Sequence, residues 1–302
     1  MRFKNHQTDL AVVAHDAGAA NLITAWCKNI QYHKLRVKLA GPAKCIWETA
    51  FGRYNEIELC KLLNGVDVLL TGTSFSSCLE HRAREIAKRH KIHNIAVLDH
   101  WVNYPERFIR NGVQILPDEI WVTDAYALRL AKDCFPNLTI TLKPNIYLEK
   151  IVSKVKSFHQ QGEHNTSNVL YVLEPIRQRW SNSELPGEFQ ALNFFVQNAE
   201  YLGLKSNTVI TLRPHPSDQK NKYDWWVKLQ KNMNIKVDTI SSLERLIASA
   251  DLVLGCESYA MVVSVACGKK TMSTLPPQAP RCRLPNKAIM HLREIVTQLN
   301  RD

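Results

Sequence analysis

Short apolar runs alternate with longer amphipathic segments along the whole chain. The runs of the first half span residues 10–15, 37–41, 67–72, 94–99 and 119–123. Between them, "AANLITAWCKNI", "SSCLEHRAREIAKRH" and "AYALRLAKDCF" place apolar residues three and four positions apart. The runs predict strands and the segments between them predict helices. Such alternation is typical of a parallel sheet with helices on both faces.

The same pattern restarts after the polar stretch "EKIVSKVKSFHQQGEHNTSN" at 149–168. The runs of the second half span residues 169–175, 209–216, 235–239, 251–256 and 270–276. We interpret 149–168 as a linker between an N-terminal domain, 1–148, and a C-terminal domain, 169–302. The sequence therefore predicts an α/β protein with two Rossmann-like domains that face one another across a cleft.

Composition agrees with a soluble globular protein of two domains. The chain has 302 residues, of which 45% are hydrophobic and 22% charged. No window holds the ~18 apolar residues that a spanning helix needs, and "MRFKNHQTDLAVVAHD" turns polar too soon for a signal peptide. We expect a cytoplasmic protein. Its eight cysteines lack the C-x-x-C spacing of zinc or redox motifs, which predicts reduced and mostly buried thiols.

The net charge favours anionic partners. Lys and Arg number 39 against 28 Asp and Glu, which gives +11. This charge fits nucleic acid, phosphorylated substrates or the acidic inner face of a membrane. At such a membrane the protein would associate peripherally. The densest basic stretch, "EHRAREIAKRHKIH", also holds two glutamates and predicts the polar face of a helix. Since no nucleic-acid motif is present, nucleic-acid binding ranks last and we expect no such partner.

Polar residues gather where the strands of the first domain are predicted to end. In "VVAHDAGAANLI" the strand ends at His15 and Asp16, and Gly18 lets a ligand approach the backbone before a helix begins. Asp16 is either a general base or a helix cap. In "TGTSFSS", at 71–77, Ser74 either donates to a phosphate or sugar hydroxyl or caps the next helix.

The fourth predicted strand runs into "LDHWVNYPERF" at 98–108, which crowds Asp99, His100, Trp101 and Tyr104 into one loop. Aromatic faces with interleaved polar groups suit sugar rings. Packing of these rings between domains is the alternative.

In the second domain, the strand ends carry charge. "LEPIRQRW" supplies Glu174 and Arg177, and "TLRPHPSD" places Arg213 and His215 each before a proline. Proline stiffens this exit from the strand and keeps the preceding residue extended. In open α/β sheets, ligands bind at these carboxyl ends.

The segment "GCESYAMVV" ends a strand at Gly255 and opens a helix at Glu257 and Ser258. Ser258 and the first N–H groups of that helix predict a phosphate site. Glu257 suits a different role, accepting hydrogen bonds from ribose hydroxyls. Capping of the helix by this pair is the alternative.

Residues 209–277 resemble the donor-binding domain of GT-B glycosyltransferases, especially bacterial sialyl- and polysialyltransferase-like proteins and CDP-glycerol phosphotransferases. The likeness is carried by His215-Pro216, by Gly255 with Ser258, and by "GCESYAMVVSVACGKKTMS". It implies a nucleotide-sugar donor in the C-terminal domain and an acceptor in the N-terminal one. By this analogy, Asp16 is the base and His215 assists the leaving phosphate.

The chain contains no D-x-D, the metal-binding signature of the other major transferase fold, so we expect no metal and no cofactor. Helix N-termini, Arg and His can stabilise a departing nucleotide instead. The leading hypothesis is metal-independent transfer of a sugar from a CMP- or UDP-linked donor to a surface-glycan or lipid-linked acceptor. The second is a nucleotide-sugar epimerase or hydrolase that uses carboxylates such as Asp16, Asp99, Glu174 and Glu257.

Overall fold

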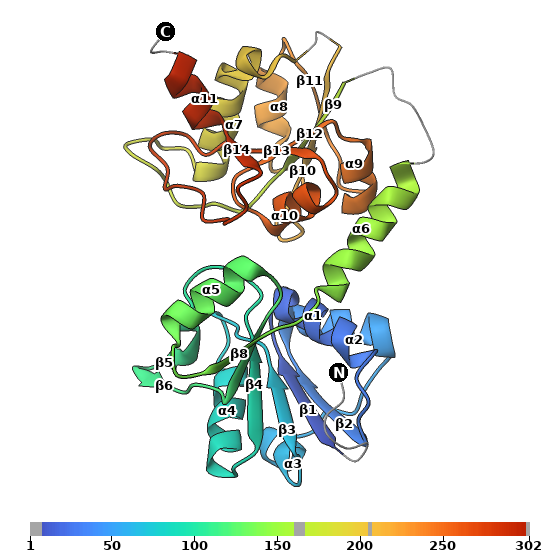
Figure 1. Cartoon of the computed structure of the whole chain (residues 1–302). Coiled ribbons are helices and arrows are strands. Elements are labelled where there is room, and N and C mark those ends of the chain that lie inside the picture. Colours follow the sequence, from blue (N-terminus) through green and yellow to red (C-terminus); the bar gives the residue numbers. More distant parts are fainter. Residues whose placement is uncertain (1–7, 160–166, 205–206, 300–302) are drawn as a thin grey trace. The chain divides into compact units, whose positions relative to one another are not determined.

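The protein divides into two units, Met1–Tyr147 and Leu148–Asp302 (Figure 1). The computed structural model describes residues 8–159, 167–204 and 207–299. Each unit holds a six-stranded sheet of parallel strands. The predicted α/β class with two parallel-sheet units is therefore confirmed, whereas a cleft between the units stays a prediction.

The sheet of unit 1 has the order β2-β1-β3-β4-β7-β8. Its strands are β1 Asp9–Ala14, β2 Lys34–Leu39, β3 Val68–Thr71, β4 His93–Val97, β7 Glu119–Val122 and β8 Thr139–Leu142. The helices are α1 Ala17–Cys27, α2 Gly41–Phe51, α3 Leu59–Leu63, α4 Leu79–Arg89 and α5 Ala125–Cys134, with a 3₁₀ turn, η1, at Glu106–Phe108. A small hairpin, β5 Ile109–Arg110 with β6 Val113–Gln114, stands apart from this sheet.

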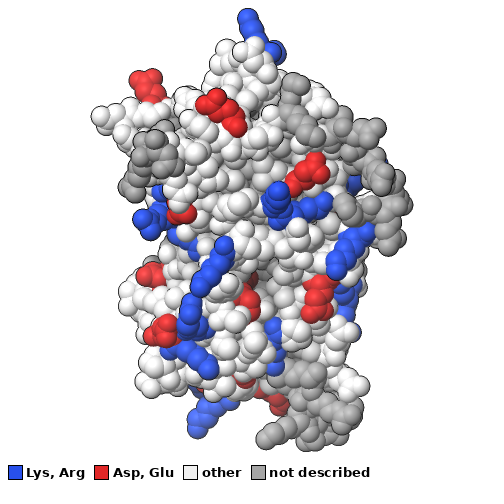
Figure 2. Space-filling model, turned by 45° about the horizontal axis from the view of Figure 1, so that its top comes forward, with Lys and Arg blue, Asp and Glu red and all other residues white. Residues whose placement is uncertain are grey.

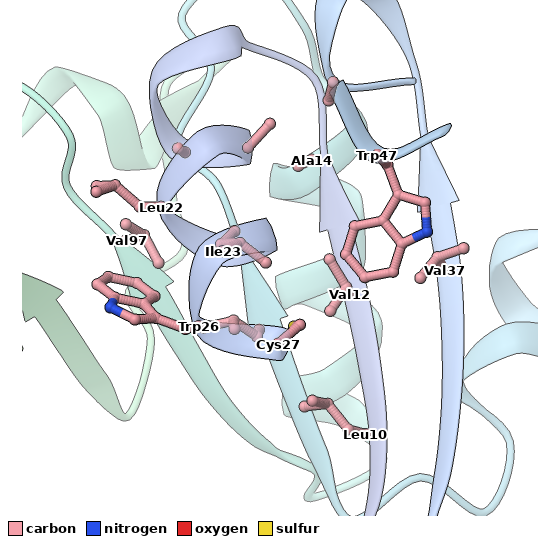
Figure 3. Close-up of a cluster of buried hydrophobic side chains, with 14 of the residues drawn as sticks. Leu10, Val12, Ala14, Leu22, Ile23, Trp26, Cys27, Val37, Trp47 and Val97 are labelled. Carbon is pink, nitrogen blue, oxygen red and sulfur yellow. The ribbon is translucent and has the colours of Figure 1, made fainter. Parts of the chain in front are cut away.

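Strand β1 is buried on both faces, which explains its unbroken apolar run. Leu10 and Val12 join a cluster with α1 and α2, in which Trp26 and Trp47 lie on either side of Ile23 (Figure 3). The alternate residues of β1, Ala11 and Val13, belong to a second cluster with α3 and α4. Successive side chains of a strand point to opposite faces, so both helix layers are anchored on one central strand.

The sheet of unit 2 has the order β11-β10-β9-β12-β13-β14. Its strands are β9 Asn168–Val172, β10 Val209–Arg213, β11 Asn234–Val237, β12 Leu252–Gly255, β13 Lys270–Ser273 and β14 Ile289–His291. The helices are α7 Gly187–Gln197, α8 Asp224–Leu229, α9 Leu243–Ser249, α10 Tyr259–Ala266 and α11 Leu292–Leu299, with a 3₁₀ turn, η2, at Ala199–Leu202. Helix α6, Ile146–His159, begins at the last two residues of unit 1 and continues into unit 2. If the strands of unit 2 are numbered from 1 to 6 along the chain, their order in the sheet is 3-2-1-4-5-6, which is the order of the dinucleotide-binding fold.

Several local predictions change in the structure. The predicted linker, 149–168, begins inside α6, and its part at 160–166 lies outside the described residues. A further strand that the apolar runs did not predict, Ile289–His291, pairs with β13 as strand β14 just before the C-terminal helix. Of the eight cysteines, all of them free, Cys27 and Cys256 are buried, so the prediction of mostly buried thiols is wrong.

The order of the strands fixes where a ligand site is expected in each unit. In unit 1, the chain passes from β1 to β2 on one side of the sheet and from β3 to β4 on the other. In unit 2, it likewise passes from β9 to β10 on one side and from β12 to β13 on the other. The crevice outside the carboxyl ends of such a strand pair is the usual ligand position in open α/β sheets. These two switch points are therefore the places to look for chemistry.

Charge is spread over the surface rather than gathered in one stripe on the face shown in Figure 2, where basic side chains lie among acidic ones. This pattern gives no support to a nucleic-acid track. Among the described helices, none combines the length and apolar character needed to cross a bilayer.

Adjacent tryptophans of α8 provide a matched test of the unit 2 core. Trp226 is 1% exposed and its indole N–H donates to Asn193 Oδ1 at 2.7 Å, whereas Trp225 is 45% exposed. Trp226→Ala should lower the free energy of unfolding by about 3–5 kcal/mol. Trp225→Ala should cost about 1 kcal/mol, because it loses mainly its contact with Phe189. Urea unfolding followed by circular dichroism measures both, and equal losses would contradict this core assignment.

Candidate functional site

Asp16 and His15 form an ordered pair at the end of β1. Asp16 occupies the N-cap position of α1, but its side chain makes no capping hydrogen bond. Its Oδ1 instead lies 2.7 Å from His15 Nδ1 and accepts from Ser76 Oγ at 3.4 Å. The capping alternative for Asp16 is therefore not what the structure shows. The carboxylate orients the imidazole.

The main chain and the ring of His15 are held by their neighbours. The His15 N–H donates to Glu80 Oε1 at 2.9 Å, and Ser74 Oγ lies 3.5 Å from Nδ1. Gly41 has φ +51°, and a Cβ there would sit 2.7 Å from ring atoms Cε1 and Nε2. Because the Nδ1 proton is directed at Asp16, Nε2 is the nitrogen with a lone pair to accept a proton.

Asp99 is brought to the same corner as Gly18. A Cβ on Gly18 would lie 1.8 Å from Asp99 Oδ2, so a larger residue here would force the Asp99 side chain to move. Arg107 donates to the carbonyl of Thr73 at 3.0 Å and to Asp99 Oδ1 at 3.4 Å. His15, Asp16, Gly18, Ser74 and Asp99 thus form one cluster, at the ends of β1, β3 and β4.

Two of the predicted sugar-facing aromatic residues are packed inside unit 1. Trp101 is 9% exposed and its indole N–H donates to Asp124 Oδ2 at 2.9 Å. Tyr104 is 1% exposed, and its burial raises the pKa of the phenol. Neither ring offers an open face to a sugar, so both pack as core residues. His100 is partly exposed, with its ring centroid 5.4 Å from that of Trp101.

Two buried charged residues beneath the cluster were not found from the sequence. Glu80 and Arg84, both on α4, are each 1% exposed. Burial raises the pKa of Glu80 and lowers that of Arg84 to about 10. Arg84 donates to the carbonyl of Gly72 at 3.1 Å, which holds the end of β3. Six of the eleven residues of this helix are charged, so charge alone does not mark these two positions as buried.

The switch point of unit 2 joins Glu174 to the start of α10. Glu174 Oε1 accepts the N–H of Glu257 at 2.7 Å, and the N–H groups of Cys256 and Ser258 act on the same carboxyl. A Cβ on Gly255 would lie 2.9 Å from Val172 Cγ2, so glycine allows the close approach of the chain here. Burial raises the pKa of Glu174 to about 7.

Ser258 stands at the N-cap of α10 without capping it. Its Oγ is buried and makes no hydrogen bond to any described residue. A buried hydroxyl without a partner is costly, so a ligand that hydrogen-bonds here would be stabilised. This favours the predicted phosphate role over capping, although Glu174 now holds an N–H group assigned to that phosphate.

Glu257 faces a partner that the sequence analysis missed. Arg283 Nε lies 3.0 and 3.2 Å from the two carboxylate oxygens, and the Arg283 N–H donates to Oε2 at 3.1 Å. Glu257 is thus already engaged by a cation. A ribose hydroxyl would share this carboxylate with Arg283.

Arg213 and His215 lie one strand away from this switch point, at the end of β10. Arg213 Nη1 donates to the carbonyl of Asp238 at 3.0 Å, on the side of β11. His215 Nδ1 accepts the N–H of Ser217 at 3.2 Å, which leaves the ring proton on Nε2. His215 is exposed at the surface, and partial desolvation of the ring lowers its pKa, which favours the neutral form. Both residues line a cavity of about 570 Å³.

A buried ion-pair network fixes the turn that follows His215. Lys222 Nζ lies 2.6 Å from Asp218 Oδ1 and 2.5 Å from Glu188 Oε1. Asp218 Oδ2 accepts from the His215 N–H at 3.1 Å and from the Tyr223 hydroxyl at 3.0 Å. Asp218 and Lys222 are four residues apart, which is the signal that could have revealed their pairing. Arg177 is exposed in the loop after β9.

No protein-family model matches the chain, and no curated protein matches it. It is similar in structure to the UDP-GlcNAc 2-epimerase from Neisseria meningitidis bound to UDP-GlcNAc, with a TM-score of 0.63 and 11% identity over 97% of this chain and 91% of that one. The UDP-N-acetylglucosamine 2-epimerase from Rickettsia bellii gives 0.54 and 13% over 89% and 79%. The wall teichoic acid polymerase TagF gives 0.39 and 11% over 89% and 70%. At these identities the first two show a shared GT-B-like fold alone.

The contact between Gly18 and Asp99 predicts a rescue. Gly18→Ala should lower the free energy of unfolding by about 1–3 kcal/mol, because the new methyl group overlaps the Asp99 carboxylate. Asp99→Ala removes the obstructing group, so Gly18→Ala should cost little in that background. A double-mutant cycle measured by urea unfolding gives the coupling. Additive losses would show that the two residues do not touch.

Proposed function

We propose that the protein is a metal-independent glycosyltransferase that moves a sugar from a CMP- or UDP-linked donor to a surface-glycan or lipid-linked acceptor. The observation that carries this proposal is the polar cluster at each switch point. Unit 2 offers a helix N-terminus with a buried, unpaired hydroxyl, which suits a phosphate. Unit 1 offers a carboxylate-oriented imidazole, which suits proton removal from an acceptor hydroxyl.

In this proposal, unit 2 holds the nucleotide through α10. The phosphate takes hydrogen bonds from the first N–H groups of the helix and from Ser258 Oγ, where the helix dipole adds to the attraction. Glu257, whose carboxylate is held by Arg283, accepts hydrogen bonds from the ribose hydroxyls. His215 donates its Nε2 proton to the leaving phosphate as a neutral group, and Arg213 and Arg177 supply positive charge nearby.

Unit 1 activates the acceptor in this proposal. His15 Nε2 removes the proton from the attacking hydroxyl, and Asp16 stabilises the imidazolium that forms. This differs from the role that the resemblance implies, in which Asp16 itself is the base. Asp99 and Ser74 border the pair and suit hydroxyl groups of the sugar or acceptor. A lipid-linked acceptor would place the enzyme at the cytoplasmic face of a membrane, where its positive charge favours acidic lipids.

Epimerisation of a nucleotide-sugar is the second candidate. The fold shared with two UDP-GlcNAc 2-epimerases and the carboxylates Asp16, Asp99, Glu174 and Glu257 favour it. The two reactions separate by product. An epimerase converts the nucleotide-sugar without any acceptor and, if it removes a carbon-bound proton, incorporates deuterium from D₂O. A transferase releases free nucleotide only as an acceptor is consumed. Nuclear magnetic resonance of reactions with a nucleotide-sugar panel reports both.

Nucleotide binding tests the donor site. CMP, CDP or UDP should raise the melting temperature without added metal, and the shift should survive EDTA. Ser258→Ala should weaken binding by about 1–2 kcal/mol, the scale of a hydrogen bond to a charged group. Ser242→Ala is the matched control, because Ser242 caps α9 by accepting from the Arg245 N–H. It should lower stability but leave affinity unchanged. Stabilisation that requires Mg²⁺ or Mn²⁺ would contradict the proposal.

Turnover of His15 and Asp16 variants tests the proton transfer. His15→Gln should lower turnover by about 10²–10⁴-fold, because it removes the proton acceptor. Asp16→Asn should also lower it, while nucleotide affinity stays near that of the native chain in both variants, since neither residue belongs to unit 2. If Asp16 were the base, His15→Gln would retain most activity. That outcome would restore the role implied by the resemblance.

A further inference from the structure

The start of α10 already holds an anion from its own chain. The Glu257 N–H, which lies one residue before the N-cap Ser258, donates to Glu174 Oε1 at 2.7 Å, so the loop that leads into α10 is where this anion is held. The Cys256 and Ser258 N–H groups act on the same carboxyl. A carboxylate and a phosphate oxygen seek the same donors, so Glu174 and a nucleotide phosphate compete for this position.

The loop before α10 also holds a hydrogen-bonding group that Glu174 does not contact, the hydroxyl of Ser258. Ser258 Oγ is buried beside these N–H groups and has no hydrogen-bond partner among the described residues. Gly255 brings the chain within contact distance of Val172, which fixes the loop between β12 and α10. The donors therefore stay in place whichever anion they hold.

The charges around Glu174 are mostly unfavourable to its ionised form. Burial has the largest effect on the pKa of Glu174 and raises it. The negative charge of Glu257 raises this pKa further, whereas the hydrogen bonds from the backbone N–H groups lower it. Arg283, paired with Glu257, is the nearby cation. The buried Cys256 and Tyr171 and the partly buried Cys282, all with raised pKa values, are further titratable groups nearby.

We propose that Glu174 is an internal plug of the phosphate site, which the nucleotide displaces and which takes up a proton when displaced. Once it loses the N–H groups, the carboxylate faces both Glu257 and the incoming phosphate, so its neutral form is favoured. The proton comes from solvent. This inference rests on the proposed nucleotide site and adds to it a pH-dependent control of donor binding.

Calorimetry of the full chain tests the plug directly. The probes are UDP-N-acetylglucosamine and CDP-glycerol, whose phosphates are diesters and keep their charge across the neutral range. In the protein without ligand, the Glu174 carboxyl has a pKa raised to about 7. Binding at about pH 8 should therefore take up about one proton, seen as a dependence of the heat on the ionisation enthalpy of the buffer. Affinity should fall up to about tenfold between pH 7 and pH 8 and change less below pH 7.

Glu174→Gln keeps an oxygen acceptor for the Glu257 N–H but cannot ionise. It should bind the probe about tenfold more tightly than the native chain at pH 8, with no proton uptake. Glu188→Gln is the matched control, because burial raises the pKa of Glu188 too, but its partner is Lys222. It should leave the uptake unchanged.

The outcomes separate the inference from the proposed function. Binding to the native chain without proton uptake and with equal affinity at both pH values would overturn the plug alone. Weaker binding to Glu174→Gln at pH 8 would also overturn it, because Glu174 would then support the ligand. Failure of both probes to bind the native chain and Glu174→Gln at any pH would overturn the nucleotide site itself.

Discussion

The burial of one central strand on both faces is the constraint on which each unit depends. In unit 1, the alternate residues of β1 belong to two separate apolar clusters, one with α1 and α2 and the other with α3 and α4. Strand β9 has the same role in unit 2, between β10 and β12. A buried polar group without a partner is costly. Residues 10–14 of β1 are accordingly all apolar, and in β9 the buried Tyr171 hydroxyl has Thr274 as its partner. The charged and titratable groups follow the two strands: His15 and Asp16 after β1, and Glu174 after β9.

Buried carboxylates hold these strand ends in place. Glu80 accepts the His15 N–H, Glu174 accepts the Glu257 N–H, and Asp218 accepts the His215 N–H. Each therefore fixes the backbone beside a residue of the proposed chemistry. Their electrostatic settings differ. Asp218 is paired with Lys222, which lowers its pKa, whereas burial dominates at Glu174 and raises its pKa. Burial raises the pKa of Glu80 as well, so Glu174 differs from Glu80 in its partners, which are the N–H groups of the proposed phosphate site.

Much of the fold followed from the sequence because it depends on periodicity. The runs at 10–15 and 251–256 became β1 and β12, and Gly255 with Ser258 was placed correctly at the start of a helix. Short edge elements escaped detection. Strand β14 has three residues, Ile289–His291, directly before α11, so its two apolar residues read as part of the helix and only the pairing with β13 identifies the strand.

The candidate site was predictable only where residues adjacent in sequence meet. His15 and Asp16 are neighbours, and their contact needs no tertiary information. The contacts Glu174–Glu257 and Glu257–Arg283 join residues that are 83 and 26 positions apart, and only the strand order brings them together. Tyr104 shows the opposite failure. An aromatic residue in a polar loop suits a sugar, but its burial depends on packing against residues of other elements, which composition does not reveal.

The central claim is that the switch point of unit 2 is a nucleotide site. Amide chemical shifts of the isotope-labelled chain test it most directly, by titration with UDP, or with CDP if cytidine is preferred. The nucleotide should shift the amides around Glu257 and Ser258 and leave those around His15 and Asp16 unchanged. If the nucleotide leaves the amides of Glu257 and Ser258 unchanged, or perturbs residues away from this strand end, the account is contradicted.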